Sequence, residues 1–509
     1  MCTRPSPAIA ILAILFAASL SASTRLVTTG GTDAGDCTVT PCATLSYAIG
    51  QAVTDDTVSV GPGTFSNGGA AIVVSKSLHV TGAQAGVDAR TRVAPESILT
   101  EPARLAADGV VLDGFTITCG MCNPPPCGAG CGIGVFTSSS FSGYAVVNNI
   151  ITGNPVGVTF GSSGALTSNL LTNNIFDNNV VFLGGPGSYG IFTSAAVTNA
   201  VVGGNRFSGQ SFGQIDFIGT PSPATVTISG NDFPLGSTDG PAVILINNTG
   251  TIITGNTVTG GSAFFGVQFF VGGDDHNISI INNGVIGTPG AILITELIGL
   301  GPNGLVTVNS NTFLNNQVGV NVGNPPGVPI EMHFNRIANN ATALITSSAS
   351  AAVNGQNNWW GCNAGPATCA TNSISAGSAV ILDPWILMNI AAAPSTVHLF
   401  QSSLVTVDFN HNSLGAAISG FPNSVLPFSA TGGNLSQPPF SPIFLGMSLM
   451  PFTATAVGPA TVSATLDAQT VTANITVTGP IPAVPPMMLA LLAAVLGSIA
   501  LFMMRKIVD

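Results

Sequence analysis

Asn149-Ile150-Ile151-Thr152-Gly153-Asn154 is one of eight related segments that decide the fold of this chain. Each segment begins with Asn, continues with apolar residues and ends in a Gly-Asn, Asn-Asn or similar turn. The leading asparagines are Asn149, Asn174, Asn205, Asn231, Asn256, Asn283, Asn311 and Asn335. They lie 25, 31, 26, 25, 27, 28 and 24 residues apart, and a period of this size indicates a solenoid. Binding or chemistry is then expected along the stacked surface rather than in one buried pocket.

The repeat is expected to consist of strands. Its apolar stretches are short, rich in Val, Ile, Phe and Thr, and interrupted by Gly, Asn or Pro, which favours pleated strands over helices. Val226–Ser229 and Val306–Asn309 alternate between apolar and polar residues. Each repeat therefore predicts one coil of a β-helix. We expect each leading Asn to occupy a left-handed bend, and asparagines of successive coils to form a ladder along the axis.

A helix is predicted at the start of the solenoid. Thr44 can cap it, and Leu45, Ala48, Ile49, Ala52 and Val53 have the spacing of one apolar helix face. Such a helix would cover the open end of the coil stack. Thr57–Val60 then predicts a strand, and 61–65 predicts a turn.

This opening resembles that of the right-handed parallel β-helix family, the pectin-lyase-like superfamily. The matching residues are Asp36-Cys37, Pro41-Cys42-Ala43-Thr44-Leu45, Tyr47-Ala48-Ile49, Asp56-Thr57-Val58 and Pro62-Gly63-Thr64-Phe65. The segment from Asn357 to Pro366 resembles the phrase that closes such solenoids in bacterial secreted proteins. The resemblance covers roughly residues 25–385 and implies the fold, whereas the activity stays open because this fold carries lyases, hydrolases, epimerases, adhesins and spacers.

The remaining chain divides by composition. Residues 394–478 predict short alternating strands of a β-sandwich, and 458–472 resemble the last strands of bacterial Ig-like domains. The fold class is therefore all-β. The expected organisation is a signal peptide at 1–23, a parallel β-helix at 24–385, an Ig-like sandwich at 394–478, a Pro-rich linker at 479–486, a transmembrane or sorting segment at 487–504 and a basic tail at 505–509.

Both termini predict export. Arg4, the apolar stretch 8–20 and Ser21-Ala22-Ser23 have the pattern of a secretory signal. Residues 487–504 carry no charge and precede Arg505-Lys506, which suits one membrane span. With the Pro-rich segment before it, this tail resembles the C-terminal sorting signals of Gram-negative bacteria, and a plain membrane anchor is the alternative. Both readings place about 24–480 outside the cytoplasm, in the cell envelope or at the cell surface.

The charge content limits the classes of binding partner, and the cysteine content predicts disulfides. Only ten Lys or Arg occur in 509 residues and the net charge is −11, which argues against nucleic acid as a partner. Cys37/Cys42 and Cys362/Cys369 are expected to form local disulfides. Cys119, Cys122, Cys127 and Cys131 suit two further disulfides or a zinc site, and the disulfides are preferred in an exported chain.

Three groups of residues were considered for catalysis of polysaccharide cleavage. Arg206 and Arg336, candidate lyase bases, are five repeats apart, roughly 20–25 Å, and only the lone Asp232 lies near either in the repeat. Asp274-Asp275-His276 faintly resembles the paired aspartates of polygalacturonases, but the other motifs of that family are missing and a solvated turn is favoured. Glu331 and His333 are expected to share one strand face. With Glu296, they are expected to serve surface hydrogen bonding.

The sequence thus favours a non-catalytic cell-surface protein, adhesive, structural or glycan-binding, with no catalytic, cofactor or metal site assigned. A polysaccharide or cell-surface glycan is the expected partner. Trp359 and Trp360 offer stacking faces for sugars, although packing at the end of the solenoid is the preferred role. The alternatives are a lyase or glycoside hydrolase acting on uronate-containing polysaccharide and, since flat Thr arrays suit it, an ice-binding rod.

Overall fold

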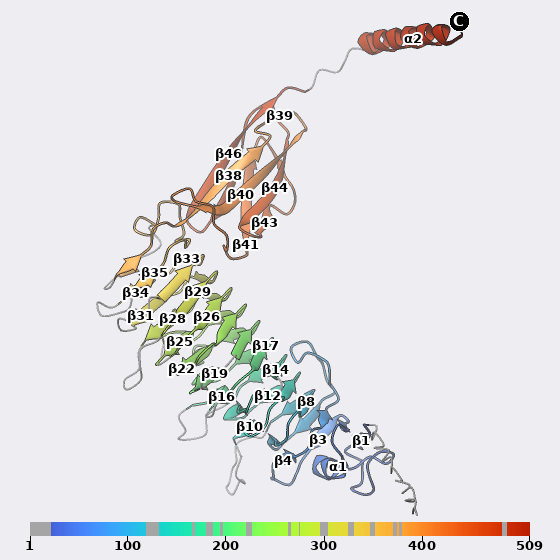
Figure 1. The fold of residues 1–509 in the computed structure, drawn as a ribbon, viewed down its shortest axis with the longest axis vertical. Coiled ribbons are helices and arrows are strands. Elements are labelled where there is room, and N and C mark those ends of the chain that lie inside the picture. Colours follow the sequence, from blue (N-terminus) through green and yellow to red (C-terminus); the bar gives the residue numbers. More distant parts are fainter. Residues whose placement is uncertain are drawn as a thin grey trace, which may run out of the picture. The chain divides into compact units, whose positions relative to one another are not determined.

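The structure is a computed structural model that describes residues 22–118, 132–164, 168–179, 187–193, 197–219, 226–262, 266–273, 275–295, 304–323, 330–346, 352–369, 374–375, 379–480 and 486–508. The predicted signal peptide, Asp274, Glu296 and the four cysteines Cys119, Cys122, Cys127 and Cys131 lie outside them. The chain divides into two compact units, 1–227 and 228–509, and each is described by itself (Figure 1).

The first unit is a stack of coils in which the chain visits three parallel sheets in turn. Sheet A consists of β1 (Thr24–Val27), β2 (Thr57–Val60), β5 (His79–Thr81), β8 (Val111–Asp113), β11 (Ala145–Val147), β14 (Asn169–Thr172) and β17 (Ala200–Gly203). Sheet B consists of β3 (Gly63–Phe65), β6 (Ser97–Leu99), β9 (Phe115–Ile117), β12 (Ile150–Thr152), β15 (Ile175–Asp177) and β18 (Arg206–Ser208). Sheet C consists of β4 (Ile72–Val74), β7 (Ala103–Leu105), β10 (Ile133–Thr137), β13 (Val156–Thr159), β16 (Tyr189–Thr193) and β19 (Gly213–Ile218).

The second unit repeats this arrangement, with β20 (Val226–Ser229) at the boundary. Its sheet A consists of β23 (Ile252–Thr254), β26 (Ile278–Ile281), β29 (Val306–Asn309), β32 (Ile330–His333), β35 (Val353–Asn354) and β37 (Val380–Ile381). Its sheet B consists of β21 (Asp232–Leu235), β24 (Thr257–Gly260), β27 (Gly284–Ile286), β30 (Thr312–Leu314) and β33 (Arg336–Ala338). Its sheet C consists of β22 (Val243–Ile246), β25 (Phe269–Gly272), β28 (Gly290–Thr295), β31 (Val318–Gly323), β34 (Thr342–Thr346) and β36 (Ile374–Ser375). The right-handed parallel β-helix that the sequence predicted is confirmed.

A β-sandwich follows the coils within the second unit. One sheet consists of β38 (Ile386–Ala393), β40 (Ser402–Asn412), β44 (Met447–Ala454) and β42 (Gly433–Leu435). The other consists of β39 (Thr396–His398), β46 (Gln469–Thr478), β45 (Gly458–Leu466), β41 (Ser424–Thr431) and β43 (Phe440–Ile443). Helix α2 (Pro486–Val508) ends the chain, and its segment Pro486–Met504 is long and apolar enough to cross a membrane. The expected domain boundaries themselves stay a prediction.

The leading asparagines form the predicted ladder in each unit. Their side chains are buried in the turn between sheets A and B. Asn149 donates its backbone N–H, at 2.8 Å, and its Nδ2 to Oδ1 of Asn174, and Asn174 does the same to Asn205. In the second unit the same pattern links Asn256, Asn283, Asn311, Asn335 and Asn358. Each amide thereby pairs backbone groups that a tight turn would leave unsatisfied.

The predicted backbone conformation of these asparagines was wrong by one residue. The left-handed position is the residue before each leading Asn: Asn148 (φ 55°), Asn173 (φ 58°), Gly204 (φ 63°), Gly230 (φ 62°), Gly255 (φ 64°), Asn282 (φ 57°), Ser310 (φ 56°) and Phe334 (φ 60°). The leading Asn needs its side chain inside the coil to reach the next amide, so the residue before it adopts the left-handed conformation that turns the chain.

The start of the first unit largely follows the prediction. Helix α1 (Leu45–Gln51) begins after Thr44, whose hydroxyl accepts the Tyr47 N–H at 3.3 Å, and buries Leu45, Ala48 and Ile49. Val53, by contrast, is 40% exposed. The turn predicted at 61–65 is also only half right, because Gly63–Phe65 pairs with β6 as a strand. Both predicted disulfides, Cys37–Cys42 and Cys362–Cys369, are present.

Candidate functional site

A second repeat, which sequence reasoning missed, lies in sheet C. Its strands follow the pattern of a variable residue, Gly, an aliphatic residue and another variable residue. In the first unit the clearest copies are 133–136, 156–159 and 189–192, and β19 has the related segment 213–216 with Gln in place of the Gly. The recurring glycine is the sequence signal that would have revealed this second repeat. The Gly and the aliphatic residue recur in each copy, so the variable residues on either side of them are free to carry function.

The glycines are required by close packing over sheet B. A Cβ on Gly190 would lie 2.5 Å from the Gln214 carbonyl oxygen and 2.9 Å from the Phe207 ring. Gly134 and Gly157 meet similar obstacles. The next residue, such as Ile191, enters the core, and the residue after it stands on the outer face, half-buried in three of these strands.

The outer face of sheet C in the first unit therefore carries a straight row of side chains. The register aligns Arg104, Phe136, Thr159, Phe192 and Asp216, one from each successive strand. The Arg104 guanidinium lies over the Phe136 ring, 5.4 Å from its centroid. Successive members are separated by about 4.8 Å, the spacing of paired strands.

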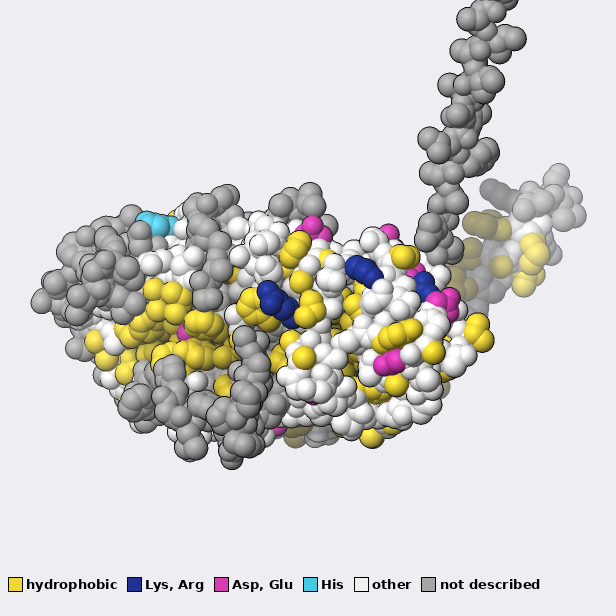
Figure 2. Space-filling view, turned by 90° about the horizontal axis from the view of Figure 1, so that it is seen from below, with side chains coloured by type: hydrophobic (Ala, Val, Ile, Leu, Met, Phe, Trp, Pro, Cys, Tyr) yellow, Lys and Arg dark blue, Asp and Glu magenta, His cyan; other side chains and the backbone are white. Residues whose placement is uncertain are grey.

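More aromatic rings gather at the Phe192 end of this row. The Tyr189 ring lies 4.9 Å from that of Phe192 and 5.1 Å from that of Phe212, each pair tilted by 46°. All three are only partly buried. We call Phe136, Thr159, Tyr189, Phe192 and Phe212 the aromatic strip. Figure 2 shows the side on which Figure 1 labels β10, β16 and β19, where hydrophobic side chains gather in a band with few charged groups.

Asp216 is the last of these residues in the first unit, and its environment is unusual. It is 1% exposed, and neither carboxylate oxygen has a hydrogen-bond partner among the described residues. Burial raises the pKa of Asp216 to about 7. Burial, and next the charge of Asp216, also raise the pKa of Tyr189. A buried carboxyl group with a raised pKa marks a candidate functional position.

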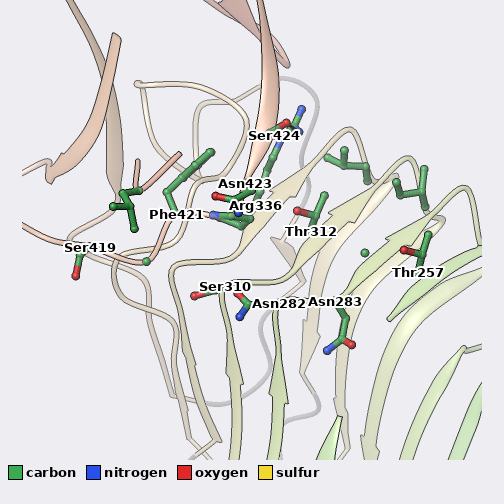
Figure 3. Close-up of a pocket in the computed structure, with 16 residues that line it drawn as sticks. Thr257, Asn282, Asn283, Ser310, Thr312, Arg336, Ser419, Phe421, Asn423 and Ser424 are labelled. Carbon is green, nitrogen blue, oxygen red and sulfur yellow. Dashed lines mark hydrogen bonds between the residues drawn. The ribbon is translucent and has the colours of Figure 1, made fainter. Parts of the chain in front are cut away.

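The second unit contains a polar cleft of about 780 Å³ between sheet B and the sandwich segment 419–424. Thr257, Gly284 and Thr312 form one row of its floor, and Ile286 and Leu314 form the next. Figure 3 shows Phe421, Asn423 and Ser424 facing this floor. Among the described residues that line the cleft there is no carboxylate, and the hydroxyl and amide groups of its lining suit an uncharged polar ligand.

Arg336, a candidate base, reaches this cleft but is already paired. Its Nε and Nη2 donate to the two carboxylate oxygens of Asp467 at 3.0 and 2.6 Å, and Nη1 donates to Ser424 Oγ at 2.8 Å. Trp359 Nε1 donates to the same carboxylate at 2.7 Å. A guanidinium held in this way joins the coils to the sandwich, and it is not free to remove a proton.

The other candidates stand on strands of sheets A and B. Arg206 is exposed on β18 of the first unit, and Asp232 is half-buried on β21 of the second. Glu331 and His333 do share a face, as predicted: His333 Nε2 lies 2.9 Å from Glu331 Oε2, and Asn354 of the next strand donates to the same oxygen. This arrangement fits the surface hydrogen bonding expected of them.

Of two predictions about the exposure of side chains, one was wrong and the other is confirmed. The solvated turn expected at Asp274-Asp275-His276 was wrong for Asp275, which is fully buried and accepts the Asn248 N–H at 2.5 Å. Burial raises the pKa of Asp275 to about 7. Trp359 and Trp360 are both fully buried, so the preferred packing role is confirmed and neither ring is free to stack on a sugar. The sequence around Trp359 and Trp360 indicated that both rings pack at the end of the solenoid. It did not indicate that Trp359 lies in the core of the β-sandwich.

Metal binding has little support in the described residues, among which no group of three or more His, Cys, Asp or Glu side chains could hold an ion.

Comparison with known proteins finds only distant likenesses, all among solved structures. No protein-family model matches the chain, and no curated protein matches it. Among solved structures it is similar to an alginate lyase in complex with a trisaccharide, at 14% identity and a TM-score of 0.40 over 70% of this chain and 84% of that one. An α-1,3-glucanase from Streptomyces thermodiastaticus matches at 13% identity and a TM-score of 0.38, covering 72% and 71% of the two chains. The tailspike of an E. coli bacteriophage in complex with a pentasaccharide matches at 11% identity and 0.36, covering 82% and 86%. Likenesses this distant carry no information about a substrate.

Proposed function

We propose that this chain is an exported, non-catalytic β-helix protein that binds glycans along the aromatic strip of its first unit. The observation that carries the proposal is the cluster of Tyr189, Phe192 and Phe212, three partly exposed rings within about 5 Å of each other in succession. Aromatic faces pack against the C–H faces of sugar rings, and Thr159 offers a hydroxyl beside them. A stacked row at strand spacing suits an extended chain better than a single small molecule.

The spacing of the charged groups on the described row supports the non-catalytic part of the proposal. Arg104 and Asp216 share the row, but four strand steps of about 4.8 Å place them roughly 19 Å apart. Glycosidases need two carboxyl groups within roughly 5–9.5 Å, and Asp216 has no such companion on this row. The signal-like N-terminus, the two disulfides and the apolar helix α2 support the proposal of export and attachment at the cell surface.

The test is binding of the full-length chain, in detergent, to a panel of neutral and acidic polysaccharides by affinity electrophoresis. Tyr189→Ala and Phe192→Ala should each weaken retention about tenfold, the upper range for one stacking ring. Phe440→Ala is the matched control, because Phe440 is an exposed aromatic residue of the sandwich (52%). Equal loss in all three variants, or in none, would contradict binding at the strip.

The alternative is a lyase or hydrolase acting on uronate-containing polysaccharide, favoured by the raised pKa of Asp216. The same incubations should therefore be followed by chain length and by the absorbance of unsaturated uronate. Chain shortening that disappears in Asp216→Asn would replace the binding proposal with catalysis.

A further inference from the structure

Asp216 distinguishes one end of the aromatic strip from the other. Its neighbours on β19, Ile215 and Phe217, are fully buried in the core, and its register partner is Phe192 of the strip. The buried carboxylate lacks donors among the described residues. When it is ionised, its negative charge is therefore not compensated by these residues.

From this placement we infer that Asp216 makes the strip select neutral glycans and reject uronate chains. The inference rests on the proposed function and adds the class of ligand. An ionised Asp216 beneath the strip would repel a uronate carboxylate bound there, because two like charges would lie close together in a partly desolvated site, whereas a neutral sugar meets no such repulsion. On this row the compensating cation, Arg104, is roughly 19 Å away by strand spacing and lies over Phe136.

The selection should depend on pH. Burial raises the pKa of Asp216 to about 7, so the carboxyl group is mostly charged at pH 8.5 and mostly neutral at pH 5.5. Tyr189 is the titratable residue on β16, the strand paired with β19 in this unit, and its raised pKa keeps it neutral at both values. Discrimination against uronates should therefore be strong at pH 8.5 and weak at pH 5.5.

The experiment compares a neutral gluco-oligosaccharide with an oligo-uronate of equal length, titrated into the full-length chain by calorimetry at pH 8.5. The wild type should prefer the neutral probe by about tenfold or more. Asp216→Asn keeps the shape and removes the charge, so the preference should shrink to about twofold. Asp177→Asn is the matched control: it removes one negative charge from sheet B of the same unit, where Asp177 accepts from Ser208, and should leave the preference unchanged.

The outcomes separate the inference from the proposed function. Binding that is lost in Tyr189→Ala, with a preference that is the same in the wild type and Asp216→Asn, would overturn the role of Asp216 alone. A wild type that binds the uronate as tightly as the neutral probe would do the same. No binding of either probe, or binding indifferent to Tyr189→Ala, would overturn both. Unchanged thermal unfolding of Asp216→Asn at pH 5.5 checks that this variant folds.

Discussion

The turn between sheets A and B and the outer face of sheet C occur in successive coils, yet they are built in opposite ways. The turn uses the same buried Asn repeatedly, as at Asn256, Asn283 and Asn311, and each one bonds to the next. The outer row of sheet C instead changes from Phe136 to Thr159, Phe192 and Asp216 in successive strands. A position whose residue is dictated by its neighbours above and below specifies the fold. A position left free by that requirement can specify a ligand.

The largest effect is expected from breaking the turn ladder. Asn283→Ala removes the acceptor for two donors of Asn256 and the donor to the Ile253 carbonyl oxygen. Each buried group left unpaired costs about 1–3 kcal/mol, so the free energy of unfolding should fall by roughly 3–5 kcal/mol. Urea unfolding measures this.

Asn282→Gly provides the matched control. Asn282 precedes Asn283 with φ 57°, a conformation that glycine adopts without strain. Its free energy of unfolding should change by less than about 1 kcal/mol. Similar losses in the two variants would show that the turn as a whole matters and the ladder does not.

The inner glycine of sheet C should come next. In Gly190→Ala the new Cβ would meet the Gln214 carbonyl oxygen and the Phe207 ring, which cannot both give way. The expected loss is about 1–3 kcal/mol, as for other overpacked cores. In Gly284→Ala a Cβ meets nothing within 4 Å, so little change is expected. Comparable melting temperatures for these two variants would refute the packing role of the sheet C glycine.

The contrast between the repeated turn and the variable outer row also explains which features of the molecule could be predicted from the sequence. The eight asparagine segments, the capped helix at Thr44 and the strand at Thr57–Val60 were predictable, because local spacing and repetition determine them. The burial of Asp275 was not, since acidic residues after two glycines indicate a solvated turn unless a distant N–H, here that of Asn248, is known to be near. The aromatic strip was not found because its residues differ in each coil and only the register brings Tyr189, Phe192 and Phe212 together.

The buried carboxyl groups predict a smaller, pH-dependent effect. Folding raises the pKa of Asp216 from 3.8 to about 7, so between these values the folded chain binds more protons than the unfolded chain, and stability must fall as pH rises. Each pKa unit corresponds to about 1.4 kcal/mol. Asp216→Asn should therefore make the loss of stability between pH 5.5 and pH 7 smaller by about 1–2 kcal/mol, measured by urea unfolding at both values.

Asp275, which has a pKa of about 7 for the same reason, gives an independent comparison in the second unit. Asp275→Asn should reduce the pH dependence similarly. If neither variant differs from the wild type in its pH dependence, both carboxyl groups titrate as exposed ones do.

The smallest effect on stability, and the sharpest test of the contrast, is expected at Thr159. It is half-buried and lies in register between Phe136 and Phe192, where it interrupts the aromatic row. Thr159→Tyr should change the free energy of unfolding by no more than about 0.5 kcal/mol, as is usual for surface positions, because no core contact is removed.

The new ring of Thr159→Tyr would extend the stacking surface by one strand. Retention on a bound polysaccharide should therefore increase several-fold, which corresponds to about 0.5–1.5 kcal/mol for one aromatic contact. Thr172→Tyr, at a half-buried position of β14 in sheet A of the same unit, should leave retention unchanged. Tighter binding with unchanged stability would separate the face that carries the ligand from the turns that carry the fold, whereas a destabilised chain with unchanged retention would show that the outer row serves the fold as well.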